Sequence, residues 1–177
     1  MRTKKTRSGF YADRGAALTQ DQLKEVLDYD PETGLFTRKT TWHRYLAGTV
    51  AGCLSPNGYI YMSVNGTRTV AHRLAWLYMT GGFPELDIDH INGDKSDNRW
   101  VNLREVSESV NLQNQRRAHR NSQSGLLGVR KNNRGDGWSA RIRIDGKVMQ
   151  IGTFRSPEAA HEAYLEAKRK YHEGCAI

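Results

Sequence analysis

Apolar and polar positions alternate in short stretches along the chain, and the first third predicts one helix and several strands. A short helix is predicted over residues 19–27, because its apolar side chains lie on one side and Thr19 is a favourable N-cap. The polar residues 30–34 predict a turn, and short strands are predicted at 34–38 and 48–52. This part of the chain is therefore expected to form a small β-rich region.

A hairpin and a helix are predicted next. Residues 59–64 and 67–70 are rich in β-branched and aromatic side chains, and Asn65-Gly66 lies between them. Both central residues of such a turn have positive φ, which Asn and Gly tolerate, so this is the strongest local hairpin signal in the chain. Residues 71–80 have apolar side chains at helical spacing, and Gly81-Gly82 ends the pattern.

The stretch that follows is dense in His, Asp and Asn, and it predicts two strands and a helix. The ranges are a strand at 86–91, a polar loop at 92–101, a strand at 102–106 and a helix at 107–119 with Ser107 as its cap. The polar residues 121–125 then predict a linker. The linker indicates a boundary between two domains.

The last part of the chain predicts a sheet covered by a helix. Residues 138–144 alternate strictly, Asp145-Gly146 supplies a turn, and residues 148–154 form the return strand, with a third strand expected at 128–131. Ser156 is expected to cap a final helix with Pro157 in its first turn. Its apolar stripe, which would pack on the sheet, consists of Ala159, Ala160, Ala163, Tyr164, Ala167 and Tyr171.

The charge of the chain is unevenly distributed. The 177 residues contain 27 Lys and Arg against 19 Asp and Glu, a formal net charge of +8. Residues 1–17 have a net charge of +4, residues 18–114 of −3 and residues 115–177 of +7. Basic flanks suit a polyanionic partner, whereas an acidic middle suits carboxylates that hold a cation. Basic runs that are merely solvated surface are the alternative.

Several classes of protein are disfavoured by the composition. Cys53 and Cys175 are far apart, so neither a disulfide framework nor a zinc ribbon is predicted. No apolar run approaches the roughly 18 residues that span a bilayer, and no apolar signal core follows the basic start. A soluble cytoplasmic protein is expected, with no membrane partner.

The most informative chemistry is the pair Asp89-His90, followed by Asn102-Leu103-Arg104 and Asn111. Neighbouring residues of a strand point to opposite faces, so Asp89 can bind a cation while His90 approaches a substrate from another side. If the following helix packs back on the hairpin, the amide oxygen of Asn111 can join the carboxylate of Asp89 on Mg²⁺ or Mn²⁺. An ordinary polar pair at a strand end is the alternative, and an EF-hand is excluded because the loop lacks the alternating ligands and the closing Glu.

These residues resemble the motif of the HNH nuclease family, a ββα-metal finger with Asp-His on the first strand, Asn on the second and His or Asn on the helix. The resemblance implies that Asp89 and Asn111 bind a divalent metal ion and that His90 is the general base that deprotonates water. It also implies that Asn102 holds the loop by hydrogen bonding. Asn111 stands where many members have a third His, which favours Mg²⁺ or Mn²⁺ over Zn²⁺.

Basic side chains near this motif are candidates for phosphate contact. Arg73, Arg99 and Arg104 are equally well interpreted as ion-pair partners of the acidic middle segment. The segment around His72 is similar to the helix that precedes the finger in phage-type HNH enzymes. For His72 a structural role is favoured over a phosphate contact.

The C-terminal sheet and helix resemble the Apetala/ethylene-response-factor DNA-binding domain over nearly all of residues 124–173. Gly128-Val129-Arg130, Trp138 to Arg143, Ile151 to Phe154 and Ser156 to Tyr164 carry the resemblance. In that family the sheet enters the major groove, and the family positions imply DNA contacts by Arg130, Arg141, Arg143 and Gln150. Gln150 stands where plant members have Trp and Arg141 where they often have Glu, so no plant target sequence is expected to transfer. A small domain with a solvated basic face is the alternative.

The fold class expected is α+β. It comprises a basic arm (1–16), a β-rich region (17–69), the finger (70–120), the linker (121–125) and the sheet-plus-helix DNA reader (126–177). The expected function is metal-dependent, site-biased cleavage of double-stranded DNA, as in phage or mobile homing endonucleases, by a monomer or weak dimer with no small-molecule substrate. A non-catalytic DNA-binding regulator is the main alternative, and an RNA-directed protein is a weaker one because no aromatic RNA-binding signature is present.

Overall fold

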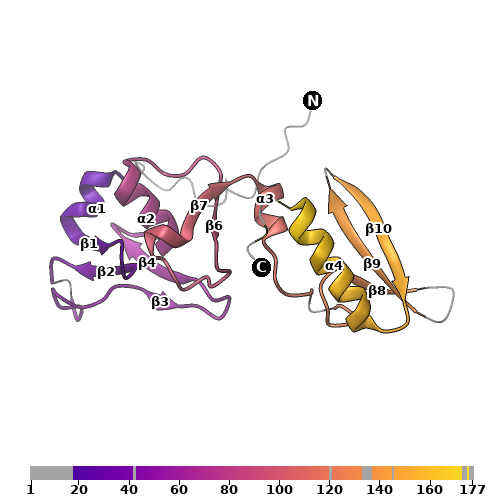
Figure 1. Ribbon diagram of the computed structural model, residues 1–177. Coiled ribbons are helices and arrows are strands. Elements are labelled where there is room, and N and C mark those ends of the chain that lie inside the picture. Colours follow the sequence, from indigo (N-terminus) through magenta and orange to yellow (C-terminus); the bar gives the residue numbers. More distant parts are fainter. Residues whose placement is uncertain are drawn as a thin grey trace, which may run out of the picture. The chain divides into compact units, whose positions relative to one another are not determined.

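The computed structural model describes residues 18–41, 43–119, 121–132, 137–144, 146–172 and 175 (Figure 1). The chain forms two compact units, residues 1–108 and 109–177. Both are mixed α/β structures built from small sheets and short helices. The basic arm predicted over residues 1–16 lies outside the described residues. Within the described part of the chain, no helix is long and apolar enough to cross a membrane.

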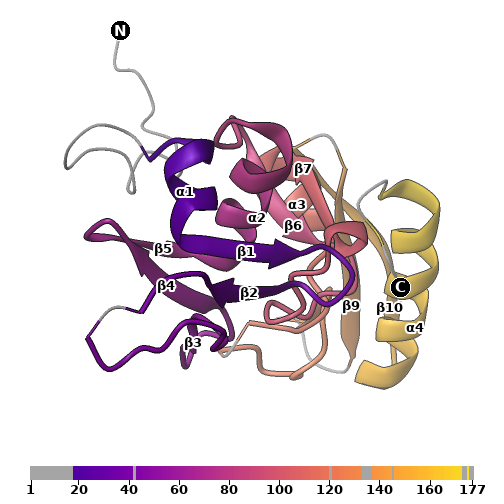
Figure 2. The same cartoon turned by 90° about the vertical axis from the view of Figure 1, so that its left-hand side faces the viewer.

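The first unit begins with a helix and a two-stranded sheet, which lie together in Figure 2. Helix α1 (Gln20–Val26) has a capping box: the Thr19 hydroxyl accepts from the Gln22 amide, and the Gln22 side chain accepts from the Thr19 amide. Strand β1 (Leu27–Asp30) follows without a loop and pairs antiparallel with β2 (Leu35–Arg38). The helix predicted from the Thr19 cap is confirmed, whereas β1 was not predicted.

A three-stranded antiparallel sheet and the second helix come next. The sheet order is β3 (Cys53–Leu54), β4 (Ile60–Val64) and β5 (Thr67–Val70), and β4 and β5 form the predicted hairpin. Its turn residues Asn65 and Gly66 have φ of 49° and 79°, as expected for this turn. Helix α2 (Ala71–Thr80) has the predicted bounds and ends at Gly81 in the left-handed conformation.

Two further strands complete the first unit. Strand β6 (Asp87–His90) pairs antiparallel with β7 (Leu103–Val106), and a short 3₁₀ helix, Trp100–Asn102, precedes β7. Helix α3 (Glu108–Gln113) follows β7, and the boundary between the two units falls at its first residue. The order strand, loop, strand, helix is therefore the predicted one.

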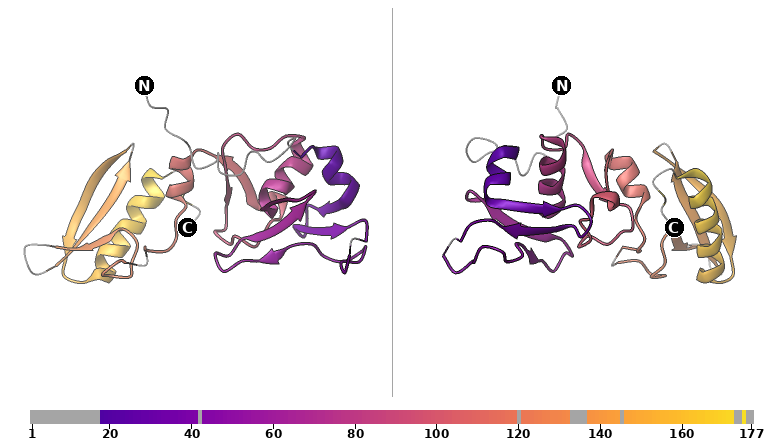
Figure 3. Two further views of the ribbon diagram at one scale, coloured as in Figure 1. Left: turned by 180° about the vertical axis from the view of Figure 1, so that it is seen from behind. Right: turned by 60° about the vertical axis from the view of Figure 1, so that its left-hand side comes forward.

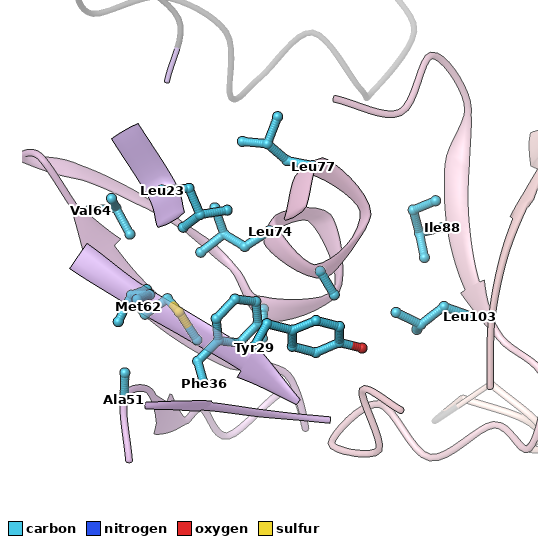
Figure 4. Close-up of a cluster of buried hydrophobic side chains, with 13 residues drawn as sticks. Leu23, Tyr29, Phe36, Ala51, Met62, Val64, Leu74, Leu77, Ile88 and Leu103 are labelled. Carbon is cyan, nitrogen blue, oxygen red and sulfur yellow. The ribbon is translucent and has the colours of Figure 1, made fainter. Parts of the chain in front are cut away.

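One hydrophobic core holds the first unit together, and Figure 4 shows most of its side chains. Leu23 of α1, Tyr29 of β1 and Phe36 of β2 pack in the same cluster as Leu74 of α2 and Leu103 of β7. The Tyr29 and Phe36 rings lie 4.8 Å apart, within the usual range for aromatic packing. The β1–β2 hairpin and the β6–β7 pair thus contribute side chains to the same hydrophobic core.

The second unit is a three-stranded antiparallel sheet covered on one face by a helix (Figure 3). The sheet order is β10 (Lys147–Phe154), β9 (Trp138–Ile144) and β8 (Val129–Lys131), and the helix is α4 (Pro157–Tyr171). Ser156 caps α4 by accepting from the Ala159 amide, as predicted. Asp145 of the predicted turn lies outside the described residues. The core of this unit comprises Val129, Ala140, Ile142, Ala160, Tyr164 and Ala167.

Two sequence-based predictions of local structure are wrong, and a predicted strand is confirmed with a shifted start. Residues 48–52 form no regular strand and contribute only a single bridge between Val50 and Thr37. The helix predicted over 107–119 ends at Gln113, because the polar residues beyond it have no apolar face to bury and the Gln115 carbonyl accepts from Lys168 of α4 instead. The strand predicted over 102–106 is confirmed as β7 but begins at Leu103, because the Asn102 side chain bonds back into the loop before it.

Candidate active site

Asp89 lies in β6 and is held by an ion pair to the paired strand. Its side chain is 8% exposed, and its Oδ2 accepts hydrogen bonds from Nε and Nη2 of Arg104 at 3.0 and 2.7 Å. Asp89 and Arg104 are register partners, so the pair crosses directly from β6 to β7. The arrangement fixes the carboxylate at one place in a largely buried setting, where charge-assisted hydrogen bonds are strong.

His90 is the last residue of β6 and is 4% exposed. Its Nε2 lies 3.2 Å from Oδ1 of Asn98, a side chain in the loop between β6 and β7. Burial lowers the pKa of His90 below its ordinary value, although the Asn98 contact and the carboxylate of Asp89 oppose the shift. The imidazole is therefore neutral near pH 7, which is the form that a general base requires.

Aromatic and histidine rings surround His90. His72 of α2 is 8% exposed, and its ring centroid lies 5.1 Å from that of His90. Tyr59, just before β4, lies 5.3 Å from the His72 ring and 6.1 Å from the His90 ring, and the Lys95 ammonium stands 4.6 Å above Tyr59. The depth of His72 agrees with the structural role favoured for it.

The loop between β6 and β7 is tied together by side-chain amides. Asn102 is 5% exposed; its Oδ1 accepts from the Asn92 amide at 2.9 Å, and its Nδ2 donates to the Asp97 carbonyl at 2.8 Å. Asn92 Nδ2 in turn donates to the Asp97 carboxylate. Asn102 thus ties together the two ends of the loop segment from Asn92 to Asp97, which follows His90.

The three arginines singled out in this region have different surroundings. Arg99 pairs with Asp97 at 2.6 Å on the surface, and Arg104 pairs with Asp89. Arg73 is half-buried, donates to the Pro84 carbonyl at 3.4 Å and lies 5.8 Å from the Phe83 ring centroid. Arg99 and Arg104 therefore make the ion pairs that were one of their two interpretations, and phosphate contact by any of the three stays a prediction.

Asn111, the candidate metal ligand on the helix, lies in α3 and belongs to the second unit. Its side chain is half-buried. The partnership of Asn111 with Asp89 on a metal ion therefore stays a prediction. Among the described residues, no three His, Cys, Asp or Glu side chains cluster as a metal site.

The C-terminal sheet has four exposed polar side chains at the positions predicted to contact DNA. Arg141 and Arg143 alternate along β9 with the buried Ala140 and Ile142, which face α4. Gln150 is the register partner of Arg141. Arg130 is the partner of Ser139, which lies on the same face as Arg141. The face opposite α4 therefore presents these four residues to solvent: Arg130, Arg141, Arg143 and Gln150.

The comparisons with known proteins bear on the same segment. Residues 69–113 match the model of the HNH endonuclease family. The HNH match begins at Thr69, just before α2, and ends with α3, so it includes Asp89, His90, Asn102 and Asn111 and stops before the C-terminal sheet and α4.

Two further comparisons add little. No curated protein matches the chain significantly. The solved structure of DNA binding and cleavage by the HNH homing endonuclease I-HmuI is 20% identical, covering 84% of this chain and 88% of that chain, with a TM-score of 0.40. A likeness at this score does not establish a shared fold, so the HNH match over residues 69–113 is the finding that has weight.

Sequence reasoning missed three residues of the candidate site. Asn98 was assigned to a plain polar loop, and Tyr59 was interpreted only as part of a strand. Tyr29 lies in a strand that was not predicted, although the alternation of Leu27 and Tyr29 with two aspartates was a usable signal for it. No spacing in the sequence distinguishes Asn98 from the other amides of its loop.

Proposed function

We propose that this protein is a divalent-metal-dependent HNH endonuclease that hydrolyses phosphodiester bonds in double-stranded DNA. The observation that carries the proposal is the buried pair Asp89-His90 at the end of β6, within the segment that matches the HNH family. The basic charge of the chain, +8 overall, fits a polyanionic substrate.

His90 serves as the general base. Hydrolysis of a phosphodiester needs a water molecule that loses its proton as it attacks phosphorus, and a neutral imidazole accepts that proton near neutral pH. Burial keeps the pKa of His90 low, so the imidazole enters the reaction unprotonated. Asn98 orients the ring from one side, and Asn102 holds the loop in which Asn98 lies.

Asp89 and Asn111 are the proposed ligands of Mg²⁺ or Mn²⁺. A carboxylate and an amide oxygen form an oxygen-only donor set, which suits a hard cation that keeps several of its waters. Asp89 fits the role because Arg104 has already fixed its carboxylate, through Oδ2. Such an ion, when bound, neutralises negative charge that develops on the phosphate and the leaving oxygen.

The C-terminal unit is the proposed DNA reader. Arg141 and Arg143 extend from the face opposite α4, with Gln150 beside Arg141. Guanidinium groups on one exposed face can donate to guanine O6 and N7 or to phosphate. Selectivity for a site is expected to come from this face, as in homing-like enzymes of phages and mobile elements.

A plasmid assay tests the endonuclease. Supercoiled plasmid is incubated with and without Mg²⁺ or Mn²⁺ for the wild type, His90→Ala and Asp89→Asn, with Glu85→Gln as a control that removes an exposed carboxylate. Metal-dependent nicking or linearisation is expected in the wild type and the control, and a loss of at least about 100-fold in His90→Ala. Tight DNA binding without cleavage of several long DNAs would instead favour a regulator.

A further inference from the structure

The Asn98 side chain makes a hydrogen bond with the His90 ring, and its own orientation is determined by a second bond. The side chain is 2% exposed. Its Nδ2 donates to the Ser96 carbonyl at 3.0 Å, and a carbonyl oxygen can only accept. The amide nitrogen therefore faces Ser96, and the amide oxygen faces Nε2 of His90.

The orientation of Asn98 determines which tautomer of His90 is present. An amide oxygen cannot donate, so the 3.2 Å contact is a hydrogen bond only if Nε2 of His90 carries the proton. In a neutral imidazole with a proton on Nε2, the lone pair is on Nδ1. Nδ1 is then the atom that can accept a proton from water.

Asn98 is itself held by the β1–β2 hairpin, which lies outside the segment that matches the HNH family. The Tyr29 hydroxyl donates to the Asn98 carbonyl at 2.7 Å, and the Trp100 amide donates to the Pro31 carbonyl at 2.9 Å. Tyr29 is 5% exposed, and its ring is part of the core (Figure 4). A buried hydroxyl and a turn carbonyl thus hold the loop backbone at Asn98 and at Trp100, two residues later.

Gly34, in the turn of that hairpin, allows the hairpin to lie directly against the backbone of the loop between β6 and β7. Its φ is +73°, and a Cβ at this position would overlap the peptide between Asn98 and Arg99. Only a residue without a side chain allows the two backbones to approach so closely. The hairpin therefore touches the loop backbone at the residue that holds His90.

We propose that Asn98 is a positioning residue that keeps His90 in the tautomer with a proton on Nε2, and that the β1–β2 hairpin keeps Asn98 in place. The proposal rests on the proposed function, in which His90 is the general base. It adds Nδ1 as the proton-accepting atom and extends the catalytic apparatus to Tyr29 and Gly34, which the family match does not include.

The first test is the tautomer itself. Nitrogen-15 NMR of the full chain at pH 7.5 distinguishes the two neutral tautomers of histidine, and the His90→Gln spectrum assigns the His90 signals. The Nε2–H form is expected in the wild type, and a mixture of both forms is expected in Asn98→Ala. An Nδ1–H form in the wild type, or an unchanged tautomer in Asn98→Ala, would overturn the proposal. This measurement needs no cleavage, so it decides the tautomer even if the chain proves not to be a nuclease.

The second test separates the rate of cleavage from DNA affinity. Asn98→Ala is expected to lower the single-turnover rate by about 10-fold to 100-fold while the Kd for DNA stays within 2-fold, because acid–base chemistry contributes about that much or more. Asn98→Asp keeps an acceptor oxygen and is expected to recover part of the rate. Equal rates in the wild type and Asn98→Ala would contradict the role of Asn98 in positioning His90.

Tyr29→Phe is a second variant that tests the proposal even if Asn98→Ala proves unstable. The substitution removes only the hydroxyl that holds the Asn98 carbonyl and leaves the ring in the core. A several-fold lower rate with unchanged DNA affinity is expected, since one hydrogen bond contributes about 1 kcal/mol. Tyr61→Phe, a more exposed tyrosine of β4, is the matched control and is expected to cleave like the wild type. A rate in Tyr29→Phe equal to that of the control would overturn the part assigned to the hairpin.

Discussion

Arg104 donates two hydrogen bonds to a single oxygen, Oδ2 of Asp89, across the β6–β7 pair. Arg104 is therefore both a strand-pairing residue and the support of the proposed metal ligand. Because the Asp89 side chain is only 8% exposed, removal of the Arg104 guanidinium leaves the Asp89 carboxylate poorly solvated and without this ion pair.

Arg104→Ala is expected to lower the free energy of unfolding of the first unit by about 2 kcal/mol, since the pair is partly buried. Arg99→Ala is the matched comparison. Its pair with Asp97 involves an arginine that is 48% exposed, so the expected loss is below about 1 kcal/mol. Urea denaturation of both variants without DNA measures the difference. Equal losses would show that the depth of the Asp89 pair has no energetic consequence.

The first unit is expected to lose stability in mild acid because of His72. Burial lowers the pKa of His72 to about 3 in the folded chain, against about 6.5 when unfolded. The unfolded chain therefore binds a proton first as the pH falls below 6.5, and the folded state loses up to about 1.4 kcal/mol per pH unit until the folded pKa is reached. The lowered pKa of His90 acts in the same direction.

His72→Leu tests this pH dependence. Urea denaturation between pH 7 and pH 4 is expected to show a slope smaller by about one proton than in the wild type. His119→Leu, which changes an exposed histidine, is expected to retain the wild-type slope. An identical slope in His72→Leu and the wild type would mean that His72 is protonated in the folded chain.

Gly128→Ala is expected to destabilise the second unit more than Gly146→Ala. Both glycines have a left-handed φ, +75° and +78°, which costs alanine about 1 kcal/mol. A Cβ at Gly128 would also overlap the buried ring of Tyr164, whereas nothing lies within 4 Å at Gly146. The extra crowding is expected to cost about 1–3 kcal/mol more. Hydrogen exchange of the β9 amides measures both effects in the full chain.

Salt dependence of DNA binding tests the exposed face of the C-terminal sheet. Arg141→Ala and Arg143→Ala are each expected to weaken binding and, where the arginine contacts a phosphate, to reduce the slope of log K against log salt by about one. Lys170→Ala removes the same charge from the end of α4, which packs on the opposite face of the sheet. The lysine variant is expected to bind like the wild type. Equal effects of all three substitutions would indicate attraction by net charge alone.

Local patterns predicted most of the elements correctly. The Asn65-Gly66 turn, the strict alternation of β9 and the Ser156 cap all depend on neighbouring residues, and each lies where the sequence indicated. The pair Asp89-His90 was found because its spacing to Asn102 and Asn111 is specific, which is also local information.

The errors and omissions have a different origin. Strand β1 has only four residues, and its identity depends on the packing of Tyr29 against Phe36 and Tyr78. Asn98 meets Tyr29 across 69 positions of the sequence. Contacts of that separation leave no periodic trace in one chain, so the residues that orient His90 could not be predicted.

The shared core of the first unit makes the finger a poor candidate for transplantation. The segment that matches the HNH family begins at residue 69. Leu74 and Leu103 of that segment, however, belong to the same buried cluster as Leu23, Tyr29 and Phe36. The loop that contains Asn98 also lies directly against Gly34. A gene fragment encoding residues 69–113 alone would produce the motif without Leu23, Tyr29 and Phe36, which are part of its hydrophobic core. Transfer of the segment that matches the HNH family into another protein is therefore expected to require at least residues 18–113 as one piece.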